Sequence, residues 1–187
     1  MVCGFCFDHQ RRFVFYAVKG HHNGNDVMKQ LVEELKKRQL TIGSCESLTA
    51  GLFASSIAAV PGASAVLKGG FVTYQTVVKE QVVHVSHDLI KEHGVVSAPC
   101  AKAMAENARR LLDCDMCVSF SGNAGPDVME GKEVGTVFCA LAVRTHTYIY
   151  ECLFHGTRNE IRQQCIVFMQ SEIMRMLKES EDITWKK

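Results

Sequence analysis

The sequence predicts a single domain with a layered α/β fold and a mixed sheet. Strand-like segments alternate with segments of helical periodicity through residues 25–180. This alternation favours parallel strands that are joined by helices. The two late strand-like runs, 134–143 and 147–154, have the spacing of a hairpin and add antiparallel pairing.

The first half of the chain shows this alternation after an extension, residues 1–24, to which we assign no role. Within the extension, residues 12–18 alternate weakly, as an edge strand does, and residues 20–24 resemble a linker. Asn25 is expected to cap the first helix. The expected elements are then a helix from 25, a strand at 40–42, a small-residue helix at 49–59, a turn at 60–64, a strand at 65–74 broken by Gly69-Gly70, and short helices at 77–85 and 87–92.

The second half begins with Gly94, which is expected to end a helix, and Ser97, which is expected to cap the next one. Thr157 and Glu160 have the spacing of a capping box. The expected elements are a helix from 97 to 112, a strand at 116–120, a loop at 121–126, a polar excursion at 127–133, the hairpin, a last helix from 157 to about 177, and a polar tail at 181–187.

The composition narrows the class of protein. The 187 residues are 47% hydrophobic and 22% charged, with a net charge of +1, so we expect one cytoplasmic domain with no nucleic-acid or membrane partner. Charged residues at 8–12 interrupt any signal-peptide core. Nine cysteines without an export signal are expected to be reduced thiols. The pairs Cys3/Cys6 and Cys114/Cys117 lie too far apart in sequence for a paired zinc site, and no metal is expected.

The turn at residues 45–51 is the first candidate site. It joins a strand to a helix, so the hydroxyl of Ser47 can stay free of the packed layers and the following backbone N–H groups can bind an anion. The turn is therefore a candidate for a nucleophile, a phosphate site or both; the alternative is a polar turn residue. The G-x-S-x-G elbow of histidine-dependent hydrolases is absent.

A serine nucleophile needs a base. Lys79 can serve if burial or a neighbouring cation lowers its pKa, and Tyr74 can relay or orient the proton. The alternative for these two residues is a solvated lysine and a half-buried tyrosine.

Two later features are candidates for ligand binding. The segment 121–126 leaves a strand, and its glycines allow close approach to a ligand; the alternative is an ordinary turn. Arg158 and Arg162 share one face of the last helix, and Arg158 lies in the first turn, where the helix dipole disfavours a cation. Together they can bind a phosphate. The alternative is a surface pair with Glu160 or Glu172.

Several short segments follow one another in an order typical of one family. They are 46–51, 60–64, Tyr74 with Lys79, 94–97, 103–105, 121–126 and 154–162. Between about residues 26 and 178 the chain thus resembles the C-terminal domain of the CinA (competence/damage-inducible) family, whose stand-alone members include nicotinamide-nucleotide amidases.

The resemblance implies a three-layer α/β/α domain. It further implies hydrolysis of the carboxamide of nicotinamide mononucleotide, to nicotinate mononucleotide and ammonia, with no metal or cofactor. It also implies a homo-oligomer, with Ser47 as the nucleophile and Lys79 and Tyr74 as its activating partners. The expected substrate-binding residues are Thr49, Gly51, Ser121, Gly122, Asn123, Ala124, Gly125, Arg158 and Arg162.

The chain departs from the family pattern at three positions that bear on substrate fit. It has Ser121 where the family usually has threonine, Asn123 where an apolar residue is frequent, and Ala50 where glycine is frequent. The alternative functions are a nucleotide-binding or regulatory homologue without turnover, and an amidase for another small carboxamide.

Overall fold

The computed structural model describes residues 24–144 and 146–179; the predictions for residues 12–18, 20–23 and 181–187 concern residues outside these ranges. Five strands form one sheet in the order β2-β1-β3-β4-β5. The strands are β1 Ile42–Glu46, β2 Leu67–Val72, β3 Met116–Gly122, β4 Thr136–Val143 and β5 Thr147–Leu153. β1 is parallel to both β2 and β3, whereas β4 is antiparallel to β3 and β5. The predicted mixed sheet with its late hairpin is confirmed.

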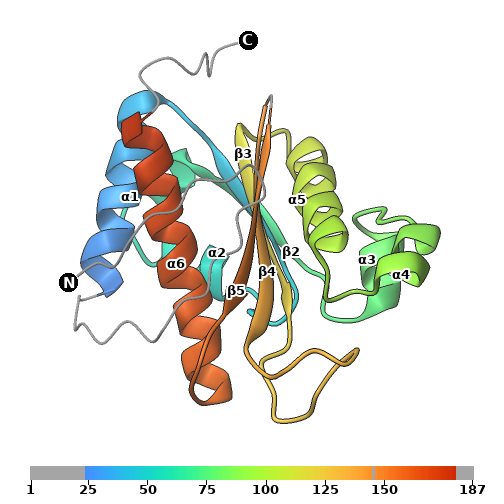
Figure 1. Ribbon diagram of the computed structural model, residues 1–187. Coiled ribbons are helices and arrows are strands. Elements are labelled where there is room, and N and C mark those ends of the chain that lie inside the picture. Colours follow the sequence, from blue (N-terminus) through green and yellow to red (C-terminus); the bar gives the residue numbers. More distant parts are fainter. Residues whose placement is uncertain (1–23, 145, 180–187) are drawn as a thin grey trace.

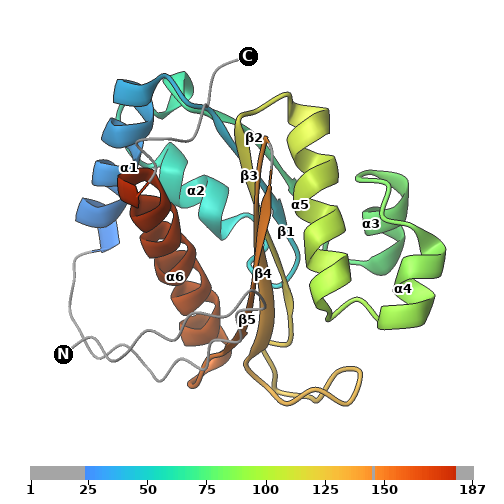
Figure 2. The same cartoon turned by 45° about the horizontal axis from the view of Figure 1, so that its top comes forward.

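Helices cover both faces of this sheet, which gives the predicted three layers (Figures 1 and 2). On one face lie α1 (Gly24–Arg38), α2 (Leu52–Ala58) and α6 (Arg158–Glu179). On the other lies α5 (Ala98–Leu112), with the short helices α3 (Thr76–Gln81) and α4 (His87–His93) beside it; a 3₁₀ turn, η1 (Ala63–Ala65), precedes β2. None of the helices in the described part of the chain is long and apolar enough to span a bilayer.

The central strands are buried on both faces, and alternate side chains serve the two layers. In β4, Cys139 and Leu141 belong to the large core beneath α1, α2 and α6, while Ala140 and Ala142 belong to the cluster beneath α5. The α5 residues that meet them are also alanines, including Ala101. Small residues on both sides let α5 lie close to the sheet, and its first turn is thereby brought near the end of β1.

Predicted caps and boundaries are confirmed in some places and wrong in others. Gly94 ends α4 with a φ of 77°, and the Ser97 side chain accepts a hydrogen bond from the Cys100 N–H, as predicted. Asn25, however, lies inside α1 instead of capping it. β1 continues to Glu46, four residues beyond the predicted strand, because its polar residues are buried and hydrogen-bonded.

The predicted small-residue helix starts later, and the predicted break in β2 is wrong. Residues 49–51 form a turn, and α2 begins at Leu52. β2 runs through Gly69 and Gly70 as one strand, with a shift of register against β1 between the pairs Ile42–Leu67 and Gly43–Gly69. A Cβ at Gly70 would lie 2.6 Å from the Ser44 hydroxyl oxygen, so the glycine permits close contact between strands and does not end one.

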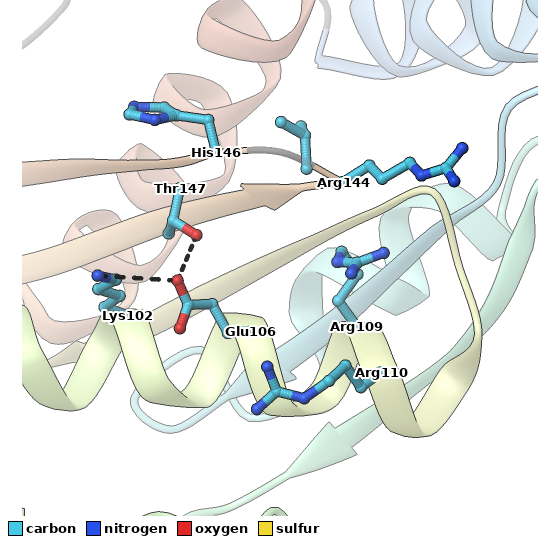
Figure 3. A pocket seen from close by; sticks show the side chains of 8 residues that line it. Lys102, Glu106, Arg109, Arg110, Arg144, His146 and Thr147 are labelled. Atoms are coloured by element: carbon cyan, nitrogen blue, oxygen red, sulfur yellow. Dashed lines mark hydrogen bonds and ion pairs between the residues drawn. The ribbon is translucent and has the colours of Figure 1, made fainter. Parts of the chain in front are cut away.

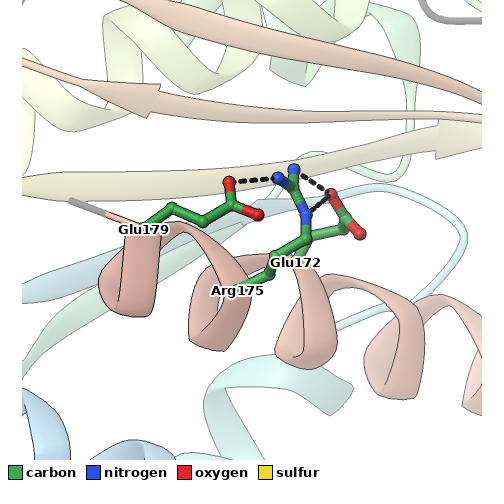
Figure 4. Close-up of polar contacts among 3 residues, drawn as sticks. All are labelled: Glu172, Arg175 and Glu179. Atoms are coloured by element: carbon green, nitrogen blue, oxygen red, sulfur yellow. Dashed lines mark hydrogen bonds and ion pairs between the residues drawn. The ribbon is translucent and has the colours of Figure 1, made fainter. Parts of the chain in front are cut away.

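Helix α6 is held at both ends by polar contacts. Thr157 and Glu160 form the predicted capping box, in which the Thr157 N–H donates to the Glu160 carboxylate at 2.7 Å. Near the other end, Arg175 donates to Glu172 at 2.8 Å and to Glu179 at 2.6 Å (Figure 4). The Glu172 hydrogen bond, together with Glu179, raises the pKa of the Arg175 guanidinium. Glu172 is therefore engaged by Arg175.

Candidate active site

Ser47 lies directly after β1, at the edge of the sheet where the parallel strands end. Its N–H donates to the Phe120 carbonyl at 3.0 Å, which extends the β1–β3 pairing by one residue and anchors the turn. The side chain is half-buried, so the hydroxyl can be reached from outside. Its hydroxyl oxygen lies 3.2 Å from the Lys79 amine.

Lys79 comes from α3, yet it is almost fully buried, with 2% of its surface exposed. Its amine donates to the Thr73 carbonyl at 2.7 Å and contacts the Ser47 hydroxyl, and no carboxylate of the described residues pairs with it. Burial lowers the pKa of the Lys79 amine, because removal from water disfavours the charged form. A neutral amine can accept the Ser47 proton across the same contact, which is the arrangement of a nucleophile and its base.

Two thiols also lie near this amine, but both are protonated. Burial raises the pKa of Cys45 to about 12 and that of Cys100 to about 11. The nucleophile is the thiolate and not the thiol, so neither cysteine competes with Ser47 at neutral pH.

Glu46 positions the turn, although the sequence did not mark it as a site residue. It is fully buried, and its carboxylate accepts hydrogen bonds from the Phe53 N–H (3.1 Å), the Ala54 N–H (3.0 Å) and the Ser44 hydroxyl (2.9 Å). The N-cap residue of α2 is Gly51, which has no side chain to bind these N–H groups. Glu46 therefore caps α2 from the preceding strand and fixes the distance between Ser47 and the helix.

The turn itself needs unusual backbone angles. Ala50 has a φ of 51° and Gly51 a φ of 89°, both in the left-handed region. Glycine adopts this region freely, whereas alanine pays roughly 1–2 kcal/mol, so the departure at Ala50 has a physical cost. The predicted ligand residue Thr49 is fully buried, and its hydroxyl has no hydrogen-bond partner among the described residues. Neither the Leu48 nor the Thr49 N–H has an acceptor within the described part of the chain.

Arg162 holds this turn from α6. Its Nε donates to the Leu48 carbonyl at 3.0 Å and one terminal nitrogen donates to the Thr49 carbonyl at 2.9 Å. Because a trans peptide points its N–H opposite to its carbonyl, the contact with Leu48 directs the Thr49 N–H away from the guanidinium. The fork of an arginine side chain thus orients the peptides that follow Ser47.

Arg158 lies one turn earlier and makes different contacts. It donates to the Gly125 carbonyl and, at 2.6 Å, to the Tyr74 hydroxyl, so it joins α6, the 121–126 segment and the segment that follows β2. Tyr74 is 54% exposed. The structure thus brings Ser47 and Lys79 into direct contact, while the phenol of Tyr74 contacts Arg158.

In the 121–125 segment the side chains mainly build the loop. The Ser121 hydroxyl donates to the Val95 carbonyl at 2.6 Å, and the Asn123 side chain bonds the Lys132 carbonyl and the Gly125 N–H. A Cβ at Gly122 would lie 2.6 Å from the Thr136 carbonyl oxygen, so packing against β4 requires this glycine. Ala124 is buried in the core. Contact of these residues with a substrate stays a prediction.

Glu130 is a second residue that sequence reasoning missed. Its carboxylate accepts from the Val95 and Val96 N–H groups, both at 2.9 Å, and ties the polar excursion to the segment before α5. This negative charge also partly opposes the effect of burial on the pKa of Lys79. A signal for Glu46 was present, because it is an acidic residue just before a helix start. For Glu130 no such signal was present, because its partner Val96 lies 34 residues away in the chain.

No group of three or more His, Cys, Asp or Glu side chains that could hold a metal ion occurs among residues 24–144 and 146–179. Cys114 and Cys117 are buried free thiols there, and Cys3 and Cys6 lie outside the described residues.

The sequence and the fold resemble those of known proteins. A competence-damage inducible protein of Geobacillus kaustophilus is 44% identical over 142 residues, which are 75% of this chain and 34% of that protein. The corresponding protein of Listeria monocytogenes is 46% identical over 133 residues, 71% of this chain and 32% of its own length. The chain thus spans about a third of the length of these relatives.

Solved structures show the same architecture over most of the chain. A CinA superfamily protein from Klebsiella pneumoniae superposes with a TM-score of 0.82 at 25% identity, covering 84% of this chain and 99% of its own. The competence/damage inducible protein from Agrobacterium tumefaciens gives a TM-score of 0.79 at 26% identity, covering 83% and 96%. The family model described as the CinA C-terminal domain matches residues 24–177, and the chain belongs to this family.

Proposed function

We propose that this domain is a metal-independent amidohydrolase that converts nicotinamide mononucleotide to nicotinate mononucleotide and ammonia. The observation that carries the proposal is the contact of 3.2 Å between the Ser47 hydroxyl and a buried lysine amine whose pKa is lowered. A serine beside a neutral amine suits acyl transfer. The nicotinamide substrate rests on the resemblance to amidases of this family.

The first half of the reaction forms an acyl-enzyme. Lys79 takes the hydroxyl proton as the Ser47 oxygen attacks the amide carbon, which gives a tetrahedral intermediate. The intermediate collapses with cleavage of the C–N bond, and the Lys79 ammonium returns the proton to the leaving nitrogen, so ammonia departs neutral. The Leu48 and Thr49 N–H groups are the candidate oxyanion donors, and one such donor contributes about 3 kcal/mol in other enzymes.

The second half releases the acid. Water attacks the ester carbonyl and gives a proton to Lys79, the ester C–O bond breaks, and Ser47 recovers its proton from the ammonium. Lys79 acts directly in both halves, since its amine already touches the Ser47 oxygen. Tyr74 acts through Arg158, which it helps to hold at the mouth of the site.

Arg158 is the better placed of the two arginines for the nucleotide phosphate. Arg162 uses its guanidinium on the Leu48 and Thr49 carbonyls, whereas Arg158 lies between Tyr74 and Gly125 at the rim. We assign Arg158 to the phosphate and Arg162 to positioning of the nucleophile turn.

One observation favours the alternative of a nucleotide-binding homologue without turnover. Ala50 occupies a left-handed position within the nucleophile turn, where many family members have glycine. A turn held under strain can present the oxyanion donors less well. The two functions differ in a single assay, because only the amidase releases ammonia.

The test is ammonia release from nicotinamide mononucleotide by the purified protein, with Ser47→Ala and the exposed Ser55→Ala as a matched control. We expect wild type and Ser55→Ala to turn over alike. Ser47→Ala should lose activity by about 10³-fold or more while its thermal unfolding is unchanged. Nucleotide binding by wild type without ammonia release would support the non-catalytic homologue, and full activity of Ser47→Ala would remove the proposed nucleophile.

A further inference from the structure

A cavity lies at the opposite end of the sheet from Ser47. It has a volume of about 360 Å³ and lies between the C-terminal half of α5 and the ends of β4 and β5 that form the hairpin (Figure 3). Its floor includes Val143, which pairs with Met116 at the first residue of β3, whereas Ser47 follows the last residue of β1. The two sites thus flank opposite ends of the sheet.

The cavity carries a surplus of positive charge. Lys102, Arg109, Arg110 and Arg144 line it together with His146, and the single carboxylate among its lining residues is Glu106. That carboxylate is engaged by the Thr147 hydroxyl at 2.7 Å and lies 3.9 Å from the Lys102 amine. One carboxylate cannot neutralise the three cations of α5, Lys102, Arg109 and Arg110, so this wall of the cavity is positively charged.

Several donors in the cavity are free to bind a ligand. Arg109 gives one N–H to the Cys114 carbonyl at 3.2 Å, and Arg110 gives one to the Asn107 side chain. A guanidinium has five N–H donors, and neither residue has another hydrogen bond with the described residues. Figure 3 shows the side chains of Arg109 and Arg110 on the wall formed by α5, with Arg144 across from them on the hairpin.

The size and chemistry of the cavity select a class of ligand. Small-molecule sites are about 300–1,000 Å³, so this cavity can hold a compact ligand. Its lining is mainly charged, and its aliphatic contribution is Val143, which gives little surface for a nucleoside base. Arginine forks match the oxygens of phosphate, and several of them in one cavity favour a ligand with more than two negative charges.

We propose that this cavity is an anion-binding site for a diphosphate or larger polyphosphate group, separate from the Ser47 site. The ligand is held through its phosphate oxygens by the arginines and lysine of α5 and the hairpin. Glu106 limits the affinity, because its carboxylate repels the same ligand.

The experiment is calorimetric titration of the full chain with inorganic pyrophosphate at low ionic strength, without metal ions. Wild type should bind saturably with one site. Lys102→Gln with Arg110→Gln removes two exposed cations without touching the Arg109–Cys114 bond, and should weaken binding at least tenfold. Lys37→Gln with Lys91→Gln removes the same charge elsewhere on the surface and should change the affinity less than twofold. Glu106→Gln should strengthen binding, a change that a purely structural role of Glu106 would not produce.

Two further variants test the anion-binding site independently of the proposed amidase activity. Ser47→Ala should bind pyrophosphate as wild type does, so loss of the amidase hypothesis would leave the result intact. Arg158→Ala should also bind normally; if it alone abolishes binding, pyrophosphate occupies the Ser47 site and the inference fails. Absence of saturable binding, or equal weakening by the two double variants, would overturn it as well.

Discussion

The two ends of the sheet both present lysine, yet burial gives the two lysines opposite roles. At the end where the parallel strands finish, the Lys79 amine is 2% exposed and bonds to a carbonyl and a serine hydroxyl. At the other end, the Lys102 side chain is 50% exposed and lies 3.9 Å from a carboxylate. Desolvation makes the first a candidate base, whereas the second is open to solvent and to an anionic ligand. Surroundings, more than residue type, decide what a lysine can do.

The largest effect expected from this comparison is the loss of Lys79 as a base. Lys79→Met and Lys79→Arg should each lower ammonia release by roughly 10²–10⁴-fold, since methionine has no proton acceptor and arginine stays protonated. Steady-state kinetics measure this. Lys91→Met, at an exposed position of α4, is the control and should keep full activity. Activity within threefold of wild type in Lys79→Arg would show that deprotonation of this side chain is not required.

The second effect separates the two arginines of α6. Arg162→Lys should lower kcat about tenfold or more with little change in KM, because lysine cannot bridge both the Leu48 and Thr49 carbonyls and the oxyanion donors lose their alignment. Arg175→Lys on the same helix disturbs only the pair with Glu172 and Glu179, so it should keep normal kcat.

Arg158→Ala should act mainly on KM. It should raise KM for the mononucleotide more than for the phosphate-free riboside, because the lost guanidinium is the group we propose for the phosphate. Kinetics with both substrates measure the difference. Equal changes for the two substrates would contradict the assignment of Arg158 to the phosphate.

A third, smaller effect concerns stability at Glu46. Glu46→Gln replaces one acceptor oxygen with an N–H₂ donor that faces the Phe53 or Ala54 N–H, so at least one buried hydrogen bond is lost. The expected cost is about 1–3 kcal/mol. Thermal unfolding should show it as a fall in Tm of about 2–4 °C for each kcal/mol. Glu33→Gln is the control, because Glu33 is 63% exposed on α1, and it should change Tm very little. A similar Tm for both variants would contradict the role of Glu46 as the cap of α2.

The smallest effect is a pH dependence of stability. The folded state lowers the pKa of Lys79 below its ordinary value of 10.5, so between these two pKa values the unfolded chain binds more protons than the folded one. The stability contributed by Lys79 therefore rises with pH through this window, by at most about 1.4 kcal/mol per pH unit. Urea unfolding should be measured at about pH 7.5 and about pH 9.5. The free energy of unfolding of wild type should increase relative to that of Lys79→Met as pH rises. A difference between the two proteins that is constant with pH would mean that Lys79 is protonated in the folded state.

Much of the fold was predictable because it depends on local patterns. The apolar stripe of α5, the cap at Ser97 and the hairpin spacing are written in neighbouring residues, and the structure has them where they were expected. The extent of β1 was not predictable, since Ser44 and Glu46 look like surface residues in sequence. They are buried because they bond to each other and to α2, and such partners emerge only in the fold.

The candidate site, like the fold, was predictable from the sequence only in part. The family pattern named Ser47, Tyr74, Lys79 and both arginines, but it did not distinguish what Arg158 and Arg162 touch. It also missed Glu46 and Glu130, whose partners are contributed by other elements.

The amino-acid order alone determined the alternation of elements, the family and the candidate reactive side chains, because periodicity, caps and motifs are short-range. Only the tertiary structure decided that the buried Lys79 amine meets the Ser47 hydroxyl, which is 32 residues away in the chain. Its burial beneath neighbouring elements is what lowers its pKa, and burial is a property of the assembled layers.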